Sequence, residues 1–127
     1  MNPNDPLLLF VYGTLKRGKK NHYALLNAHY LNESCTSPDY LLVDLGPYPG
    51  MVEKPQEGFS VQGELFEIPY KLKIELDKIE DAPVLFNLEL ITLADGSKAF
   101  AYLYKQSILE ARMLSDGVWK SSFLLDG

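Results

Sequence analysis

The sequence is short of the residues that build disulfides and metal sites. It contains one cysteine, Cys35, so no disulfide can form within the chain and a reducing, cytoplasmic location is expected. The only two histidines, His22 and His29, have no paired cysteines nearby, and neither lies in a motif that would activate Cys35 as a nucleophile. We therefore expect no metal and no cofactor.

Long hydrophobic runs and an excess of positive charge are also missing. The longest apolar run is far too short to span a bilayer, and the polar start of the chain is not typical of a signal peptide. Because 12 Lys and Arg face 17 Asp and Glu, the formal charge of −5 argues against a nucleic-acid-binding or membrane-binding protein. One local exception is a basic cluster, which we interpret as a solvated face, with a specific anion site and a nucleic-acid contact as the weaker alternatives: Lys16, Arg17, Lys19 and Lys20.

The length and the 46% of hydrophobic residues are enough for one globular domain over residues 1–127. Its core is expected to be stable without a disulfide or a structural metal. Hydrophobic periodicity and turn residues predict strands over 7–12, 29–36, 40–45, 61–68, 86–93 and 99–104. They also predict a short helix within 21–28, with Asn21 as its N-cap, and a second over 70–80, with Pro69 at its first position. The class is α+β, with a mixed or mostly antiparallel sheet that could close into a small barrel.

The first strand ends at a turn that is suited to anion binding. Tyr12 stands at the end of the strand, and Gly13 allows a tight turn or a close approach of the backbone. The amide N–H groups of Gly13, Thr14 and Leu15 would then be left unpaired by the sheet and free to point at an anion. The alternative is an ordinary loop after a buried strand, with Tyr12 simply in the core.

A carboxylate stands in the apolar stripe of the second helix. Leu72, Leu76 and Glu80 are spaced four residues apart, so Glu80 lies on or beside the face that the leucines bury. A buried, unpaired carboxylate is costly when ionised, so its pKa rises or it finds partners, which suits a general acid and base. The alternative is that the helix frays before Glu80. Other charged residues of this helix are predicted to be solvated: Lys73, Asp77 and Lys78.

The turn and the carboxylate complement each other chemically. Backbone amides can stabilise a developing oxyanion, and a carboxylate with a raised pKa can move a proton. Together they can perform acyl transfer without Ser, Cys or a metal when the substrate carries its own amine as the nucleophile.

Four separated segments, with two shorter ones near the end, carry a resemblance to the gamma-glutamylcyclotransferase-like family, which includes the gamma-glutamylamine cyclotransferases. The segments are YGTLKRG (12–18) followed by NH (21–22), GPYPGMV (46–52), VQGELF (61–66), LDKIEDAP (76–83), AFAY (99–102) and GVW (117–119). They occur in the family's order and cover most of the chain, so the set is specific although each match alone is weak.

The resemblance implies a small mixed or antiparallel β-barrel flanked by a few helices. It also implies a lyase-type or acyltransferase-type cyclisation that releases 5-oxoproline from a small gamma-glutamyl amine or peptide, as in glutathione metabolism. Glu80 corresponds to the acid/base residue, and Tyr12, Gly13, Thr14 and Leu15 correspond to the loop that binds the glutamyl group through backbone amides. Tyr102 corresponds to a residue of the cavity wall, with a core position as the alternative. We expect a monomer or a weak dimer.

The sequence departs from the family pattern at two positions. Phe86 stands where the family usually has Tyr, and Leu88 where it has Arg, so a hydroxyl and a cation beside the presumed site are lost. Phe86 keeps the ring and is expected to line the substrate site. These losses motivate an alternative function, a non-catalytic domain that binds a small metabolite in the same cavity.

Two interpretations are open for each of three further residues, Tyr48, Pro49 and Glu64. Tyr48 and Pro49 would stiffen the loop over 46–50 or, less favoured, would rim the pocket. Glu64 would pair with a cation of the basic cluster or face solvent, and Trp119 is predicted to pack the end of the chain onto the sheet.

Overall fold

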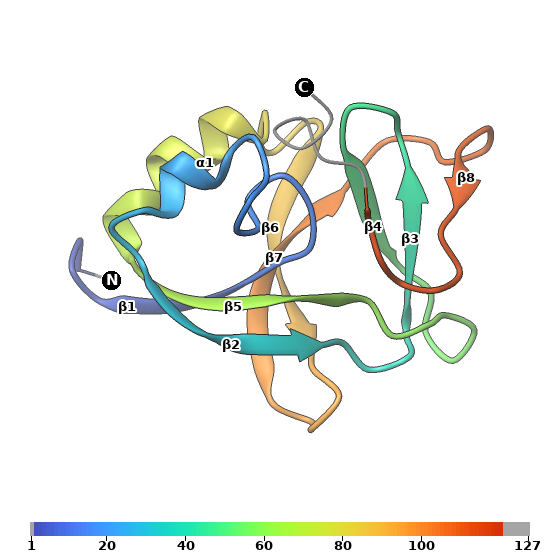
Figure 1. The fold of residues 1–127 in the computed structure, drawn as a ribbon, viewed down its shortest axis with the longest axis horizontal. Helices are drawn as coiled ribbons and strands as arrows, with labels where there is room; N and C mark the ends of the chain where they lie inside the picture. The colour runs from blue at the N-terminus through green and yellow to red at the C-terminus, as the bar shows by residue number, and fades with distance from the viewer. Residues whose placement is uncertain (1, 121–127) are drawn as a thin grey trace.

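The computed structural model describes residues 2–120, which form two β-sheets and three short helices (Figure 1). The larger sheet has five strands in the order β2-β5-β1-β7-β6, and β1 pairs in parallel with β7 while the other neighbours are antiparallel. Its strands are β1 (Pro6–Val11), β2 (His29–Cys35), β5 (Gln62–Pro69), β6 (Phe86–Thr92) and β7 (Lys98–Tyr104). The strand predicted over 29–36 is confirmed as β2, which lies at an edge of this sheet, and β6 and β7 form a hairpin around Asp95–Gly96.

The smaller sheet has three strands in the order β4-β3-β8, and it stands beside one end of the larger sheet (Figure 1). Its strands are β3 (Tyr40–Asp44), β4 (Pro49–Glu53) and β8 (Arg112–Met113). Pro49 and Gly50 belong to β4, so the prediction of one loop over 46–50 is wrong in its second half. The mixed sheet with few helices confirms the α+β class, and closure into one barrel stays a prediction.

The central strand β1 is buried on both faces, which explains its continuous apolar run. Leu7, Leu9 and Val11 point into the core cluster that the helices cover. Phe10 and the following Tyr12 point the opposite way, into the cluster shared with the small sheet. Packing on both faces therefore holds the end of β1 in position, and the predicted anion-binding turn follows directly after it.

The helices are shorter than the sequence predicts. The first is a single 3₁₀ turn, His22–Leu25, and Asn21 stands at its N-cap without making a side-chain cap hydrogen bond. The second begins as a 3₁₀ turn, Tyr70–Leu72, and continues as α1, Lys73–Ile79, with Glu80 at the C-cap. Pro69 ends β5 and precedes the helix instead of occupying its first turn. Within residues 2–120, none of the helices has the length and apolar character needed to cross a bilayer.

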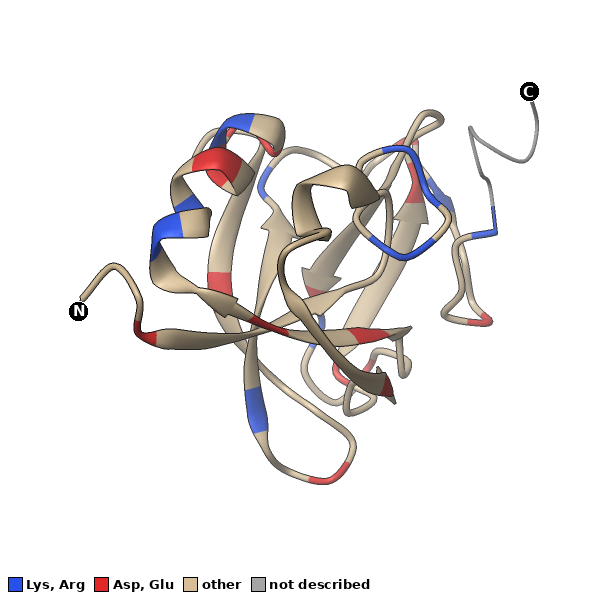
Figure 2. Ribbon diagram, turned by 60° about the vertical axis from the view of Figure 1, so that its left-hand side comes forward, with Lys and Arg blue, Asp and Glu red and all other residues tan. Residues whose placement is uncertain are grey.

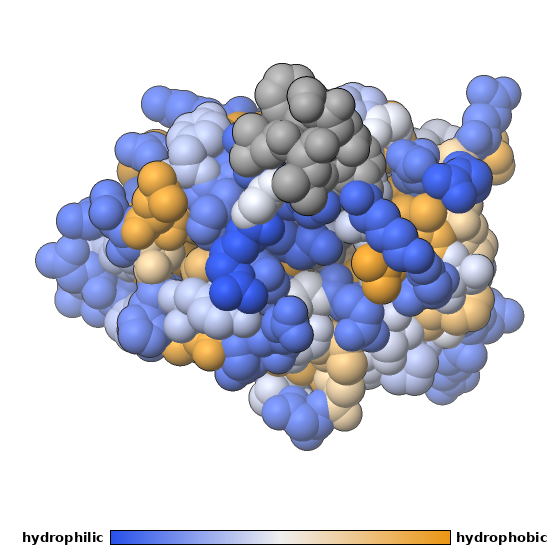
Figure 3. Space-filling model, viewed as in Figure 1, coloured by the Kyte–Doolittle hydropathy of each residue, from blue (hydrophilic) through white to orange (hydrophobic). Residues whose placement is uncertain are grey.

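Close packing is evident at Gly63 and at Trp119, and the second agrees with its prediction. A Cβ on Gly63 would lie 2.4 Å from the carbonyl oxygen of Val11, so only glycine allows β5 and β1 to approach there. Trp119 is buried in the same core cluster as Phe10. The face shown in Figure 3 is mostly hydrophilic, with apolar side chains in small separate areas, as is ordinary for a globular protein.

Candidate active site

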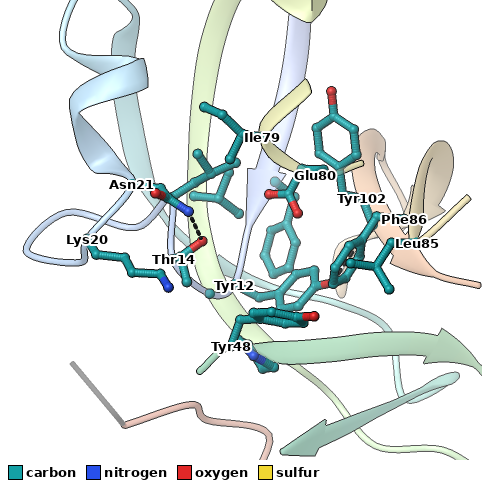
Figure 4. Close-up of a pocket in the computed structure, with 15 residues that line it drawn as sticks. Tyr12, Thr14, Lys20, Asn21, Tyr48, Ile79, Glu80, Leu85, Phe86 and Tyr102 are labelled. Carbon is teal, nitrogen blue, oxygen red and sulfur yellow. Dashed lines mark hydrogen bonds between the residues drawn. The ribbon is translucent and has the colours of Figure 1, made fainter. Parts of the chain in front are cut away.

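A partly enclosed pocket of about 170 Å³ lies where the turn after β1, the end of α1, the start of β6 and the start of β4 come together (Figure 4). Its volume suits one small organic group. All seven predicted site residues line it: Tyr12, Gly13, Thr14, Leu15, Glu80, Phe86 and Tyr102. The fold thus brings together residues that are up to 90 positions apart in the sequence. The chemical role of each residue stays a prediction.

Gly13 is required at the turn because the start of β4 packs against it. A Cβ on Gly13 would lie 2.8 Å from Cγ and 2.9 Å from Cδ of Pro49, well inside contact distance. The turn is held by two bonds of Asn21: its backbone amide donates to the Thr14 carbonyl at 2.9 Å and its Nδ2 donates to Thr14 Oγ1 at 2.9 Å. Asn21 therefore stabilises this turn instead of capping the following helix.

The turn presents unpaired backbone donors. Among the bonds formed within residues 2–120, none uses the N–H groups of Gly13, Thr14 or Leu15. Gly13 has no side chain, so its backbone itself lines the pocket. All three residues are buried, where an N–H group without a partner is costly. An anionic or carbonyl oxygen in the pocket would satisfy these donors.

Glu80 supplies the opposite kind of group. Its amide still donates to the Leu76 carbonyl at 3.0 Å, so the helix does not fray before it, and its half-buried carboxylate projects into the pocket (Figure 4). This carboxylate has no hydrogen bond or ion pair with any other described residue. Burial raises the pKa of Glu80 to about 7, because the charged form loses hydration without gaining a partner. Such a group can both accept and donate a proton near neutral pH.

The two tyrosines belong to the core and to the pocket wall at once. The Tyr12 hydroxyl donates to the Tyr102 carbonyl oxygen at 2.6 Å and accepts the Met51 amide at 3.1 Å. Burial, with the nearby charge of Glu80 as a smaller cause, raises the pKa of Tyr12 far above its usual range. Tyr12 is therefore a fixed hydrogen-bonded wall.

Asp77 was missed as part of this region. The sequence places it on a solvated face, but it lies between two partners: its Oδ1 accepts the Tyr102 hydroxyl at 2.7 Å and its Oδ2 accepts Lys73 Nζ at 2.6 Å. Burial and this bond to Asp77 raise the pKa of Tyr102 strongly. The spacing of Lys73 and Asp77 by four residues signals their ion pair. No nearby residue in the sequence predicts the bond to Tyr102, because Tyr102 lies on β7.

An aromatic group closes the side of the pocket at β6. The rings of Tyr48 and Phe86 lie 5.8 Å apart edge to face, and Phe86 also packs on Tyr104 at 5.4 Å. Tyr48 and Pro49 line the pocket, so the favoured interpretation of them as loop stiffeners alone is wrong. Phe86 brings no hydroxyl to Glu80, and the half-buried Leu88 packs at the edge of the core.

The basic cluster is not a uniform solvated face, although its residues gather on one loop (Figure 2). Arg17 pairs with Glu64, Nε to Oε2 at 3.2 Å, and donates its amide to Oε1 at 2.9 Å, which confirms the predicted pairing of Glu64. Lys16 Nζ donates to the Trp119 carbonyl at 3.4 Å, and Lys19 lies over the Trp119 ring. Lys20 lines the pocket.

The pocket combines one carboxylate with a turn of backbone N–H groups. Across residues 2–120, the His, Cys, Asp and Glu side chains form no group of three that could hold a metal ion.

Comparisons with known proteins identify similar sequences. The family model described as gamma-glutamyl cyclotransferase, AIG2-like, matches residues 9–121. A putative gamma-glutamylcyclotransferase of Vibrio cholerae is 38% identical over 112 residues, which cover 88% of this chain and 94% of that protein. The gamma-glutamylaminecyclotransferase of Mus musculus is 35% identical over 85 residues, 61% of this chain and 57% of the mouse protein.

The fold is shared with a solved structure as well. A crystal structure of an AIG2-like protein from Mus musculus superposes with a TM-score of 0.76 and 26% sequence identity, over 91% of this chain and 88% of the mouse chain. Its likeness supports the arrangement of mixed sheets and few helices described above.

Proposed function

This chain belongs to the gamma-glutamyl cyclotransferase, AIG2-like family, and on that premise we propose that it releases 5-oxoproline from a small gamma-glutamyl compound. The observation that carries the proposal is that one pocket holds both a carboxylate and a turn of amides, and that neither has a partner among residues 2–120. Buried donors and acceptors are normally hydrogen-bonded. Donors and an acceptor that lack partners in one buried pocket therefore favour a ligand that supplies them.

In the first step Glu80 takes a proton from the alpha-ammonium group of the glutamyl part. The freed amine attacks the gamma-carbonyl carbon, a C–N bond forms, and the carbonyl oxygen becomes negatively charged. The amides of Gly13, Thr14 and Leu15 are placed to donate to this oxyanion. The attack closes a five-membered ring within the substrate, so holding the substrate in the right conformation supplies much of the acceleration.

In the second step the intermediate collapses. The carbonyl re-forms, the bond to the original leaving nitrogen breaks, and Glu80 returns its proton to that nitrogen. The ring nitrogen, positively charged after the attack, loses its second proton to solvent, from which the released amine takes up a proton. The products are 5-oxoproline and the free amine, and Glu80 is again ionised. Tyr12 and Phe86 form the wall on which the glutamyl chain packs, and Tyr102 is held behind it by Asp77.

The test is to measure 5-oxoproline by liquid chromatography from a panel of gamma-glutamyl amines, amino acids and peptides. Glu80→Gln should lower kcat by about 10²–10⁴-fold, the usual contribution of a positioned acid and base. Glu75→Gln is the matched control, because Glu75 is an exposed carboxylate on the same helix. Full activity of Glu80→Gln would contradict the mechanism.

If the purified protein binds these compounds but releases no 5-oxoproline from any of them, the metabolite-binding alternative replaces the enzyme.

A further inference from the structure

One cation of the basic cluster differs from the others. Arg17 is paired with Glu64, and Lys16 and Lys19 both contact Trp119. Lys20 is half-buried, yet within the described chain it makes neither an ion pair nor a hydrogen bond. It lines the pocket instead, and Figure 4 shows its side chain extending toward Thr14.

The position of Lys20 in the pocket indicates which part of a substrate it would meet. Gly13, Thr14 and Leu15 are buried, whereas Lys20 is only half-buried and so lies nearer the solvent side. A cavity of about 170 Å³ holds one group the size of a glutamyl chain beside the amides and Glu80. A leaving amine that extends from there toward solvent on the side of Lys20 would pass its ammonium group.

The charge of Lys20 has a consequence for the leaving group. Glu80, the carboxylate that shares the pocket, is not bonded to it. A partly desolvated ammonium group gains most from an anion, gains little from a neutral group and repels a second cation. A carboxylate on the leaving amine would give Lys20 the partner that the described chain does not.

We propose that Lys20 binds the carboxylate of the leaving amine, so that this protein acts on gamma-glutamyl amino acids and peptides in preference to gamma-glutamyl amines without a carboxylate. The inference rests on the proposed function and names the substrate class of the same site. In this proposal Lys20 determines which leaving group is preferred, and Glu80 performs the proton transfers.

The experiment compares two substrates of nearly the same size, gamma-glutamylalanine and gamma-glutamylalaninamide, which differ in the charge of the leaving group. The unsubstituted protein should prefer the first by about tenfold in kcat/KM, the ratio expected of one charge-assisted contact. Lys20→Gln should abolish the preference by lowering kcat/KM for gamma-glutamylalanine alone. Lys20→Glu should favour the amide, and Lys20→Arg should keep the original order.

Lys71→Gln is the matched control, because Lys71 is exposed and does not line the pocket. Raising the salt concentration should shrink the preference of the unsubstituted protein but not that of Lys20→Gln.

Two results would overturn the inference. An equal fall for both substrates in Lys20→Gln would mean that Lys20 serves the glutamyl part, which the two share. No change for either would mean that it binds no part of the substrate.

If the unsubstituted protein releases 5-oxoproline neither from these two compounds nor from any other compound of the panel, the proposed function fails instead. Calorimetric binding of the two compounds to the unsubstituted protein and to Lys20→Gln then decides the role of Lys20 by itself.

Discussion

The turn after β1 and the end of α1 meet at the pocket from two sides, and they differ in what they leave unpaired. The turn is held by Asn21 and its amide donors have no partner among residues 2–120. The helix end holds Asp77, whose carboxylate accepts two hydrogen bonds, and Glu80, whose carboxylate has no partner within the same residues. Asp77 and Glu80 are three residues apart, nearly one helical turn. One of them is held by hydrogen bonds and the other is not. Two neighbouring residues of a helix can therefore differ in role, one supporting the structure and the other available for chemistry.

The largest effect is expected from breaking the turn side. Gly13→Ala places a methyl group against the Pro49 ring, which cannot swing away, and should lower the free energy of unfolding by about 3 kcal/mol, the upper end for overpacking. Activity should fall with it, because the amides move. Urea denaturation and 5-oxoproline release measure the two losses. Pro49→Ala in the same chain removes the colliding atoms and should restore part of both, and a double variant no better than Gly13→Ala would rule out this contact as the cause.

At the helix end, the stability of the protein should depend on pH through Glu80. Burial raises the folded-state pKa of Glu80 to about 7 from an ordinary 4.5. A raised carboxyl pKa means that the folded chain binds the extra proton, so the stability is full below pH 4.5 and is lost as pH rises to 7. The loss should be roughly 2–3 kcal/mol.

Glu80→Gln should remove this part of the pH dependence in denaturation series at pH 5 and pH 8 and should be the more stable form at pH 8. Activity of the unsubstituted protein should change in the opposite direction, with kcat/KM rising through pH 7 as Glu80 ionises. An unchanged stability profile in Glu80→Gln would contradict the assignment of the pKa.

A smaller effect is expected from the Asp77 carboxylate. Asp77→Ala leaves the buried Tyr102 hydroxyl without its acceptor and should cost about 2 kcal/mol. Tyr102→Phe removes only the donor and leaves Asp77 bonded to Lys73, so it should cost less. The double variant should be less destabilised than the sum of the two, and a double-mutant cycle in urea measures that coupling. Strict additivity would mean that the bond contributes nothing, and the contrast between Asp77 and Glu80 would then lose its basis.

Much of the fold and part of the site could be predicted from local patterns. The apolar run of β1, the turn at Gly13 and the stripe that carries Glu80 are each encoded within about ten residues, where periodicity is informative. The errors came where distant segments meet. Pro49 was assigned to a loop because prolines favour turns, although it opens β4 and packs on Gly13.

By itself, the sequence determined the family, the α+β class and the residues that line one pocket, because these depend on periodicity and on short motifs in order. Only the tertiary structure decided which polar groups there are paired. The bond from Tyr102 to Asp77 joins positions 25 residues apart, and that from Tyr12 to Tyr102 joins positions 90 apart. Hydrogen bonds depend on fractions of an ångström between such positions. That is why Asp77 proved to be hydrogen-bonded, while Glu80 and Lys20 have no partner among residues 2–120.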